Sequence, residues 1–292
     1  MMRLQVTEKY ADFVCGEVLA GRYWYQDLFK PHVHPLNTPG GDTVSLRAPH
    51  DHRHHKGLMY GLRTAEVNFW EEHSNTAKEK LGRQRHDEFT EIIAEGDEVG
   101  FEEQLTWLAE DGSLETFLER RSLRCLLTTA TLRSFHWKWT TELIAKRDVV
   151  LTISPWSIVN SQGRLVNYHG LGLRLRRDFG CTGGNLLLLD GEPVPFTEGL
   201  GARPKQATFI GSIDDTAPVR RAGVQFIGGP TSALFVSENP FAFISLGPTV
   251  LEGIELGCGQ SLKTAYTVSV FDDGPGENGS RAPRADSVPG HH

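Results

Sequence analysis

Residues 135–140 read FHWKWT, and this stretch places an aromatic side chain at every second position. Phe135, Trp137 and Trp139 alternate there with three polar residues. A period of two is typical of a β-strand that buries one of its faces. We therefore expect these three rings to lie in a core beneath a sheet.

The rest of the chain repeats this pattern in short runs. Apolar runs of strand length occur at 186–189, 224–227, 233–236, 241–246 and 264–271. The Asp-Gly pairs at 111–112 and 190–191 are strong hairpin signals. Only residues 71–81 have a weak helical pattern. The sequence therefore predicts an all-β fold, a large antiparallel two-sheet β-sandwich with little helix.

The chain has 292 residues, of which 39% are hydrophobic, enough for a full-sized core. No internal repeat or linker precedes residue 272, so we expect a single β-sandwich domain over residues 1–275. Residues 276–292 are rich in Pro, Gly, Ser and charge, and we expect a disordered tail there. His291 and His292 belong to this tail and are set aside from any site.

Charge and cysteine usage narrow the possible partners and location. The formal net charge of −7 argues against nucleic acid or an anionic membrane as a partner. No run approaches the ~18 apolar residues that cross a bilayer, and the first residues do not resemble a secretory signal. The four cysteines lie far apart, which favours buried reduced thiols. We expect a soluble, cytoplasmic protein.

Histidines are concentrated near one end of the chain. Eight of the 12 lie between His32 and His86, and six of those fall within residues 32–55. Prolines and a Gly-Gly pair interrupt this segment, so much of it should be loop, where functional residues concentrate. If residues 51–56 are extended, His52 and His54 share one face.

Histidines at this spacing could together bind a metal ion. His34, His52 and His54 are the ligands we expect if one binds, and imidazoles suit several divalent metals. No spacing matches a tight metal motif such as H-E-x-x-H. A divalent metal is the one cofactor that this spacing suggests. The alternative is a solvated or mutually hydrogen-bonded group of structural histidines.

The same segment can carry acid/base chemistry, because the pKa of a histidine side chain is ordinarily near neutral pH. We expect His34 and either His54 or His55 to divide the roles of proton acceptor and donor. Asp51 is the candidate that orients an imidazole ring.

Three cations are candidates for binding a substrate and stabilising developing negative charge: Arg53, Lys56 and Arg174. The paired arginines 120–121 and 176–177 are expected to be solvated instead.

A sugar site needs an apolar ring face as well as hydrogen-bonding groups. Trp70 beside Glu71, and Tyr168 beside His169, are the expected substrate-binding pairs. Most tryptophans in a sandwich belong to the core, and Trp70 is the likeliest exception because a carboxylate and the histidine segment flank it.

Four motifs carry a resemblance to a known family. The strings K-P-x-x-H-P-L-x-T-P-x-G (30–41), D-H-x-H-H-x-G-L (51–58) and N-F-W-E (68–71), with G-L-G-L-R (170–174), resemble the PmoA family, a domain of unknown function. The resemblance spans about residues 1–275. It implies a supersandwich similar to galactose mutarotase and an association with sugar oxidation. The "methane oxygenase" label of that family does not suit a chain without a membrane-spanning segment. By resemblance to mutarotases, Glu252 or Glu255 is a candidate late carboxylate.

Three functional hypotheses follow. The first is a carbohydrate-active lyase, hydrolase or epimerase that acts on a sugar or an oxidised (keto) sugar with its histidine-rich loop. The second is a non-catalytic carbohydrate-binding module, and the third is a metal-binding or redox protein. A small-molecule carbohydrate is the expected partner, and the oligomeric state is left open.

Overall fold

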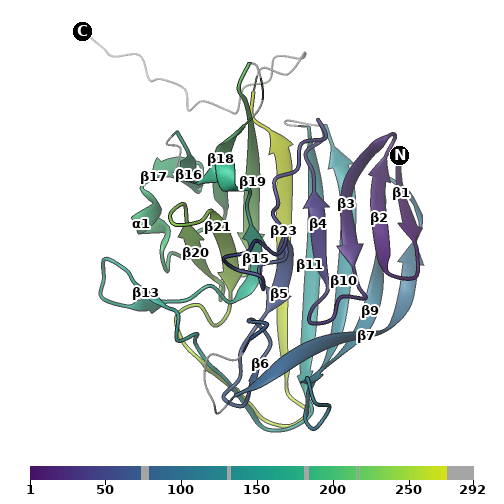
Figure 1. Cartoon of the computed structure of the whole chain (residues 1–292), viewed down its shortest axis with the longest axis vertical. Helices are drawn as coiled ribbons and strands as arrows, with labels where there is room; N and C mark the ends of the chain where they lie inside the picture. Colours follow the sequence, from purple (N-terminus) through teal and green to yellow (C-terminus); the bar gives the residue numbers. More distant parts are fainter. Residues whose placement is uncertain (74–78, 130–132, 181–183, 215, 217, 275–292) are drawn as a thin grey trace.

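A computed structural model describes residues 1–73, 79–129, 133–180, 184–214, 216 and 218–274. Their regular elements are almost all β-strands, which form two large sheets stacked face to face (Figure 1). Helix in these residues is confined to the single turns η1 (Arg177–Phe179) and α1 (Phe196–Gly199). The predicted all-β sandwich is confirmed.

The first sheet has nine strands, all paired antiparallel. In order across the sheet they are β20 (Ala233–Ser237), β21 (Phe243–Gly247), β15 (Gly170–Arg174), β5 (Leu58–Gly61), β4 (His32–Leu36), β3 (Val18–Trp24), β2 (Tyr10–Cys15), β1 (Met2–Val6) and β8 (Glu95–Gly96).

The second sheet has ten strands, antiparallel except for the pair β6–β7. Its order is β17 (Glu192–Val194), β16 (Leu186–Leu189), β18 (Ala207–Ile213), β19 (Arg220–Gly228), β23 (Ser261–Asp272), β11 (Ser134–Ala145), β10 (Glu115–Thr128), β9 (Glu98–Ala109), β7 (Lys80–Ile93) and β6 (Val67–Asn68). Two small ladders complete the fold: β12 (Val149–Leu151) with β22 (Ile254–Leu256), and β13 (Ile158–Val159) with β14 (Leu165–Val166).

Aromatic side chains fill the space between the two sheets. Phe135, Trp137 and Trp139 on β11 are all buried, as the period of two predicts. The ring of Trp137 packs edge-on against Phe13 of the opposite sheet, with centroids 4.8 Å apart. Burial of such large apolar surfaces is the main stabilising contribution to the sandwich.

One arginine joins this core. Alternation along β10 turns Arg120 to solvent and Arg121 inward. The guanidinium of Arg121 lies 2.7 Å from the Glu119 carboxylate and donates to the Tyr23 hydroxyl at 2.8 Å. The expectation that both arginines are solvated is therefore wrong for Arg121, whose buried charge is tolerated because it is paired.

The nine-stranded sheet buries side chains on both of its faces near β5 and β15. Leu58 and Tyr60 point into the main core, whereas Met59 between them belongs to a second apolar cluster. This second cluster contains Met59, Trp70, Val166, Tyr168, Ala233, Phe235, Phe243 and Val250. Loops therefore cover the outer face of this sheet, and the candidate site lies among them.

Several local expectations need correction or fall outside the described residues. No helix forms in the described parts of 71–81: residues 72–73 are a bend and β7 begins at Lys80. Residues 74–78, the predicted disordered tail 276–292 and Cys181 lie outside the described residues. Cys258 is exposed, although we expected buried thiols. No helix in the described residues is long and apolar enough to cross a membrane.

Candidate functional site

A small pocket of about 190 Å³ lies over the outer apolar cluster. Its lining residues come from four separate segments: Asp51, His52, His54, Glu71, His73, Trp156 and Tyr168. Five of these seven residues carry a carboxylate or an imidazole, and the other two are aromatic. The pocket thus brings the histidine-rich segment together with the N-F-W-E motif.

Two consecutive turns shape the histidine-rich loop. The amide of His52 donates to the Pro49 carbonyl at 3.0 Å, and the amide of His55 donates to the His52 carbonyl at 2.9 Å. The loop is therefore not extended, contrary to expectation. As a result the rings of His52 and His55 stack, with centroids 4.9 Å apart, and His54 turns toward the pocket.

The N-F-W-E motif is fixed by its asparagine and by two glycines of the sheet. The Asn68 side-chain oxygen accepts hydrogen bonds from the amides of Trp70 and Glu71, each at 3.0 Å. Trp70 then lies over strand positions without side chains: a Cβ atom would come within 2.8 Å of its ring at Gly61 and within 3.1 Å at Gly172. The glycines of G-L-G-L-R thus have a packing role.

A buried lysine joins these two loops. The Lys30 ammonium group donates to the main-chain carbonyls of His54, at 3.3 Å, and Trp70. Burial lowers the pKa of Lys30 to about 8, and the Glu72 carboxylate opposes part of that effect. One acceptor belongs to the pocket residue His54, and the other belongs to Trp70, which directly precedes the pocket residue Glu71. Lys30 therefore sets the relative position of His54 and Glu71.

The electrostatics of His54 are those of a neutral ring. Its exposed fraction is 4%, and neither ring nitrogen has a hydrogen-bond partner among the described residues. Burial, with a smaller effect of the positive charge of Lys30, lowers the pKa of His54 to about 2. The imidazole is therefore uncharged at neutral pH and free to donate or accept one hydrogen bond at each nitrogen.

Glu71 is the second buried polar group of the pocket. It is 1% exposed, and neither carboxylate oxygen has a hydrogen-bond partner among the described residues. Burial raises the pKa of Glu71, against the opposing effects of the Asn68 side chain and of the positive charges of Arg63 and Lys30. An unpartnered buried carboxylate is costly to a fold, which makes it a candidate for function.

Asp51 has the opposite electrostatic setting. Its carboxylate lies 2.7 Å from the Arg177 guanidinium and 3.2 Å from that of Arg174. Burial alone would raise the pKa of Asp51. Hydrogen bonds from His52 and Arg177 outweigh burial and hold this pKa well below its usual value. The pKa values of the two pocket carboxyls are therefore shifted in opposite directions.

Several predicted residues lie directly behind the lining. His55, Trp70, His169 and Arg174 are buried there. Arg174 stacks on Phe241, with its guanidinium carbon 4.5 Å from the ring centroid. His169 packs 5.5 Å from Trp70 between ring centroids, and burial lowers its pKa to about 3. These side chains support the pocket rather than line it. The expectation that Trp70 lies outside the core is wrong, because its ring is fully buried in the outer apolar cluster.

Three other predicted residues stand apart from the pocket lining. His34 on β4 pairs through Nδ1 with the Ser45 hydroxyl at 2.9 Å. Lys56 is buried against Asp27 and Glu72, at 2.6 and 3.0 Å. Arg53 is exposed. The predicted proton-transfer pair of His34 with His54 is thus not assembled in one pocket.

The candidate late carboxylates also lie elsewhere. Glu252 is 70% exposed at its side chain and Glu255 is exposed, and neither lines the pocket. Sequence reasoning instead missed His73 and Trp156. The only signal for Trp156 is its place in S-P-W-S, a turn-like sequence with one large aromatic residue.

The residues present do not form an obvious metal site. Within the described ranges, no group of three or more His, Cys, Asp or Glu side chains is arranged to hold a metal ion. The predicted ligand set is divided, since His34 is absent from the lining that contains His52 and His54.

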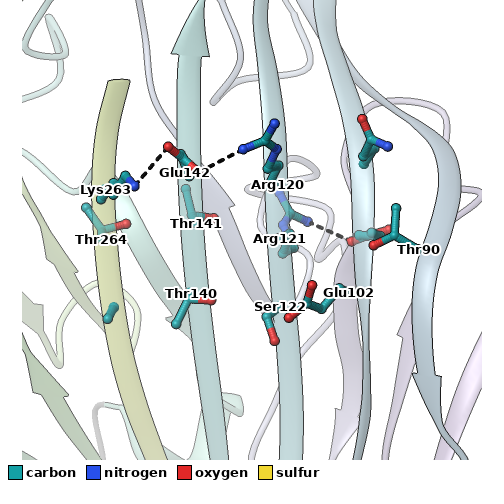
Figure 2. A pocket seen from close by; sticks show the side chains of 13 residues that line it. Thr90, Glu102, Arg120, Arg121, Ser122, Thr140, Thr141, Glu142, Lys263 and Thr264 are labelled. Atoms are coloured by element: carbon teal, nitrogen blue, oxygen red, sulfur yellow. Dashed lines mark ion pairs between the residues drawn. The ribbon is translucent and has the colours of Figure 1, made fainter. Parts of the chain in front are cut away.

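A larger hollow of about 640 Å³ lies on the outer face of the ten-stranded sheet. Figure 2 shows Lys263, Glu142 and Arg120 side by side above the shorter Thr140 and Ser122. The charges pair with one another, Glu142 lying 3.0 Å from Lys263 and 3.6 Å from Arg120. We therefore place the candidate site in the smaller pocket, where buried polar groups lack partners.

The fold and the pocket define a β-sandwich protein with a loop-built, histidine- and carboxylate-lined site. Comparison of the sequence with known families matches residues 10–282 to the family of unknown function DUF6807, and the chain belongs to this family. No curated protein matches the chain. The resemblances to the PmoA family and to galactose mutarotase stay predictions.

Proposed function

We propose that this protein is a carbohydrate-active enzyme that performs proton transfer on a sugar or keto sugar in the Glu71–His54 pocket. The observation that carries the proposal is the presence in one pocket of two buried polar groups, Glu71 and His54, whose side-chain polar atoms have no hydrogen-bond partner in the described part of the chain. Buried polar groups normally have partners, so a ligand that supplies hydroxyl or carbonyl groups accounts for both.

The size and lining of the pocket support a single sugar ring as the ligand. Its volume of about 190 Å³ is below the ~300 Å³ at which pockets for drug-sized ligands begin. Tyr168 and Trp156 offer aromatic surface to the apolar face of a ring, while Glu71 and His54 face hydroxyl groups. We place the reaction in the cytoplasm, because the three described cysteines are free.

For a keto sugar, the roles follow from the electrostatics. The Glu71 carboxylate removes the proton from the carbon beside the carbonyl, and the electron pair moves onto the carbonyl oxygen to form an enolate. A neutral His54 donates its N–H to that oxygen. In an elimination the carbonyl re-forms, a double bond forms between the deprotonated carbon and the next carbon, the C–O bond on that next carbon breaks, and the departing oxygen takes the proton from Glu71. In an epimerisation Glu71 loses its proton to water, and a water molecule protonates the opposite face of the same carbon.

Hydrolysis would use the same groups differently. Protonated Glu71 would give its proton to the departing oxygen, while ionised Asp51 would take one from the attacking water. Two carboxyls whose environments drive their pKa values apart suit such a division of roles. Lyase, epimerase and hydrolase therefore share Glu71 as the proton-transfer group.

The test uses mass spectrometry to detect turnover of a panel of monosaccharides, disaccharides and their keto derivatives. We expect a product with the wild-type protein and with Glu252→Gln, and none with Glu71→Gln. Binding of a sugar by calorimetry without any product across the panel would instead favour the carbohydrate-binding module. Absence of both sugar binding and product formation across the panel would reject a carbohydrate role.

A further inference from the structure

Trp156 combines two properties that rarely occur together. It lines the pocket, yet 59% of its surface is exposed. The other aromatic lining residue, Tyr168, is 8% exposed. The indole of Trp156 therefore lies at the mouth of the pocket, with much of its surface turned away from the pocket interior. Exposed aromatic surface of this size is unfavourable in water and is typical of a contact site.

The main chain of Trp156 is nevertheless well held. Its amide donates to the Ser154 hydroxyl at 3.1 Å, and the Ser157 hydroxyl donates to the Ser154 carbonyl at 2.7 Å. Ser154 is buried, and its hydroxyl also interacts with the Tyr168 side chain. Ser154 thus connects the turn that carries Trp156 to Tyr168 in the pocket wall. A ligand ring stacked on the indole of Trp156 would therefore have a fixed position relative to the pocket.

The exposed apolar surface continues beyond Trp156. The adjacent β13–β14 hairpin projects at the left of Figure 1 and exposes Ile158, Val159 and Leu165 by 44%, 60% and 48%. These side chains carry no charge, so they suit a group with an apolar face. The pocket itself has room for one small ring. Any group attached to that ring must therefore extend out through the mouth of the pocket.

From this geometry we infer that the substrate is a glycoside rather than a free monosaccharide: its terminal sugar fills the pocket, and the apolar face of the attached group stacks on Trp156. The inference rests on the proposed function and adds the identity of the substrate class. Trp156 is then a specificity-determining residue. It contacts the attached group and takes no part in proton transfer.

The test compares a methyl glycoside with the phenyl glycoside of the same sugar, using the sugar that gives turnover in the panel. Trp156→Ala should raise KM for the phenyl glycoside about tenfold and change KM for the methyl glycoside less than twofold. Trp156→Phe should restore most of the loss, since it keeps a stacking ring. Val219→Ala, at another exposed apolar position, should leave both values unchanged.

Each outcome decides the inference. Equal effects of Trp156→Ala on the two glycosides would overturn it while leaving the proposed function intact. Failure of the wild-type protein to bind or turn over either glycoside would overturn both. Light scattering on wild type and Trp156→Ala covers the remaining alternative: a wild-type dimer that becomes a monomer in the variant would make Trp156 a contact between copies and would overturn the inference.

Discussion

Trp70 lies across Gly61, where an added Cβ atom would come within 2.8 Å of Cε3 of the indole. The absence of a side chain at Gly61 allows the indole ring to lie against the outer face of the nine-stranded sheet. Because Trp70 directly precedes Glu71, this contact also decides where the buried carboxylate enters the pocket. Packing of the sheet and placement of the candidate proton-transfer group are therefore coupled.

Gly61→Ala should displace Trp70 and lower both stability and turnover. Overpacking of this kind typically costs about 1–3 kcal/mol, which urea unfolding would measure. Gly229→Ala is the matched control, because no atom lies within 4 Å of its added Cβ and its backbone is not in the left-handed region. Equal stabilities for the two variants would show that Trp70 can move at no cost.

Glu71→Gln should make the protein more stable while it abolishes turnover. The folded state raises the pKa of Glu71, so the stability associated with this group is fully present below the unfolded value of about 4.5 and is lost as pH rises through the folded pKa. The neutral amide removes that penalty, and melting temperature at pH 8 should rise relative to wild type. Glu252→Gln, at an exposed carboxylate, should change it little. A lower melting temperature for Glu71→Gln would show that the carboxylate has a stabilising partner.

His54→Ala should reduce turnover and leave the fold intact. Its ring has no hydrogen-bond partner among the described residues, so its loss removes packing but no protein hydrogen bond. A single donor to a developing oxyanion contributes about 10²- to 10³-fold to rate. His50→Ala, in the same loop but exposed, is the control. Unfolding of His54→Ala, seen by circular dichroism, would make this histidine structural.

Acid should destabilise the protein below pH 6.5. Burial lowers the folded pKa of His54 to about 2 and of His169 to about 3. Between those values and the unfolded pKa of about 6.5, the unfolded chain binds a proton that the folded chain does not, so stability falls as pH falls. Each such group contributes up to about 1.4 kcal/mol per pH unit. Urea unfolding from pH 7 to pH 5 should show a slope that becomes shallower in His54→Ala; an unchanged slope would mean that His54 titrates normally.

Local pattern in the sequence was sufficient for much of the sandwich. The alternation at residues 135–140 identified β11 and its buried face, and the run at 186–189 coincides with β16 before its Asp-Gly turn. Arg121 was misassigned because arginine pairs are usually solvated, and here alternation turns only one of them inward.

The site was predicted only in part, because it depends on contacts between distant residues. His54 and Glu71 were both candidates from the sequence, and both line one pocket. Their setting also depends on the pairing of β5 with β15, which sets Gly172 opposite Met59 and creates the floor on which Trp70 lies. No local pattern encodes that pairing. The turns at Pro49–His52 and His52–His55, and the approach of Trp156 from a third loop, likewise arise from the folded chain.

The most direct test of the account is the turnover rate of Glu71→Gln beside wild type and Glu252→Gln, on the substrate found in the panel. Proton NMR in D₂O would follow both product formation and deuterium incorporation beside the carbonyl. We predict that Glu71→Gln, folded and at least as stable as wild type, is slower by about 100-fold or more, while Glu252→Gln matches wild type. A Glu71→Gln protein that works at the wild-type rate would contradict the assignment of proton transfer to this pocket.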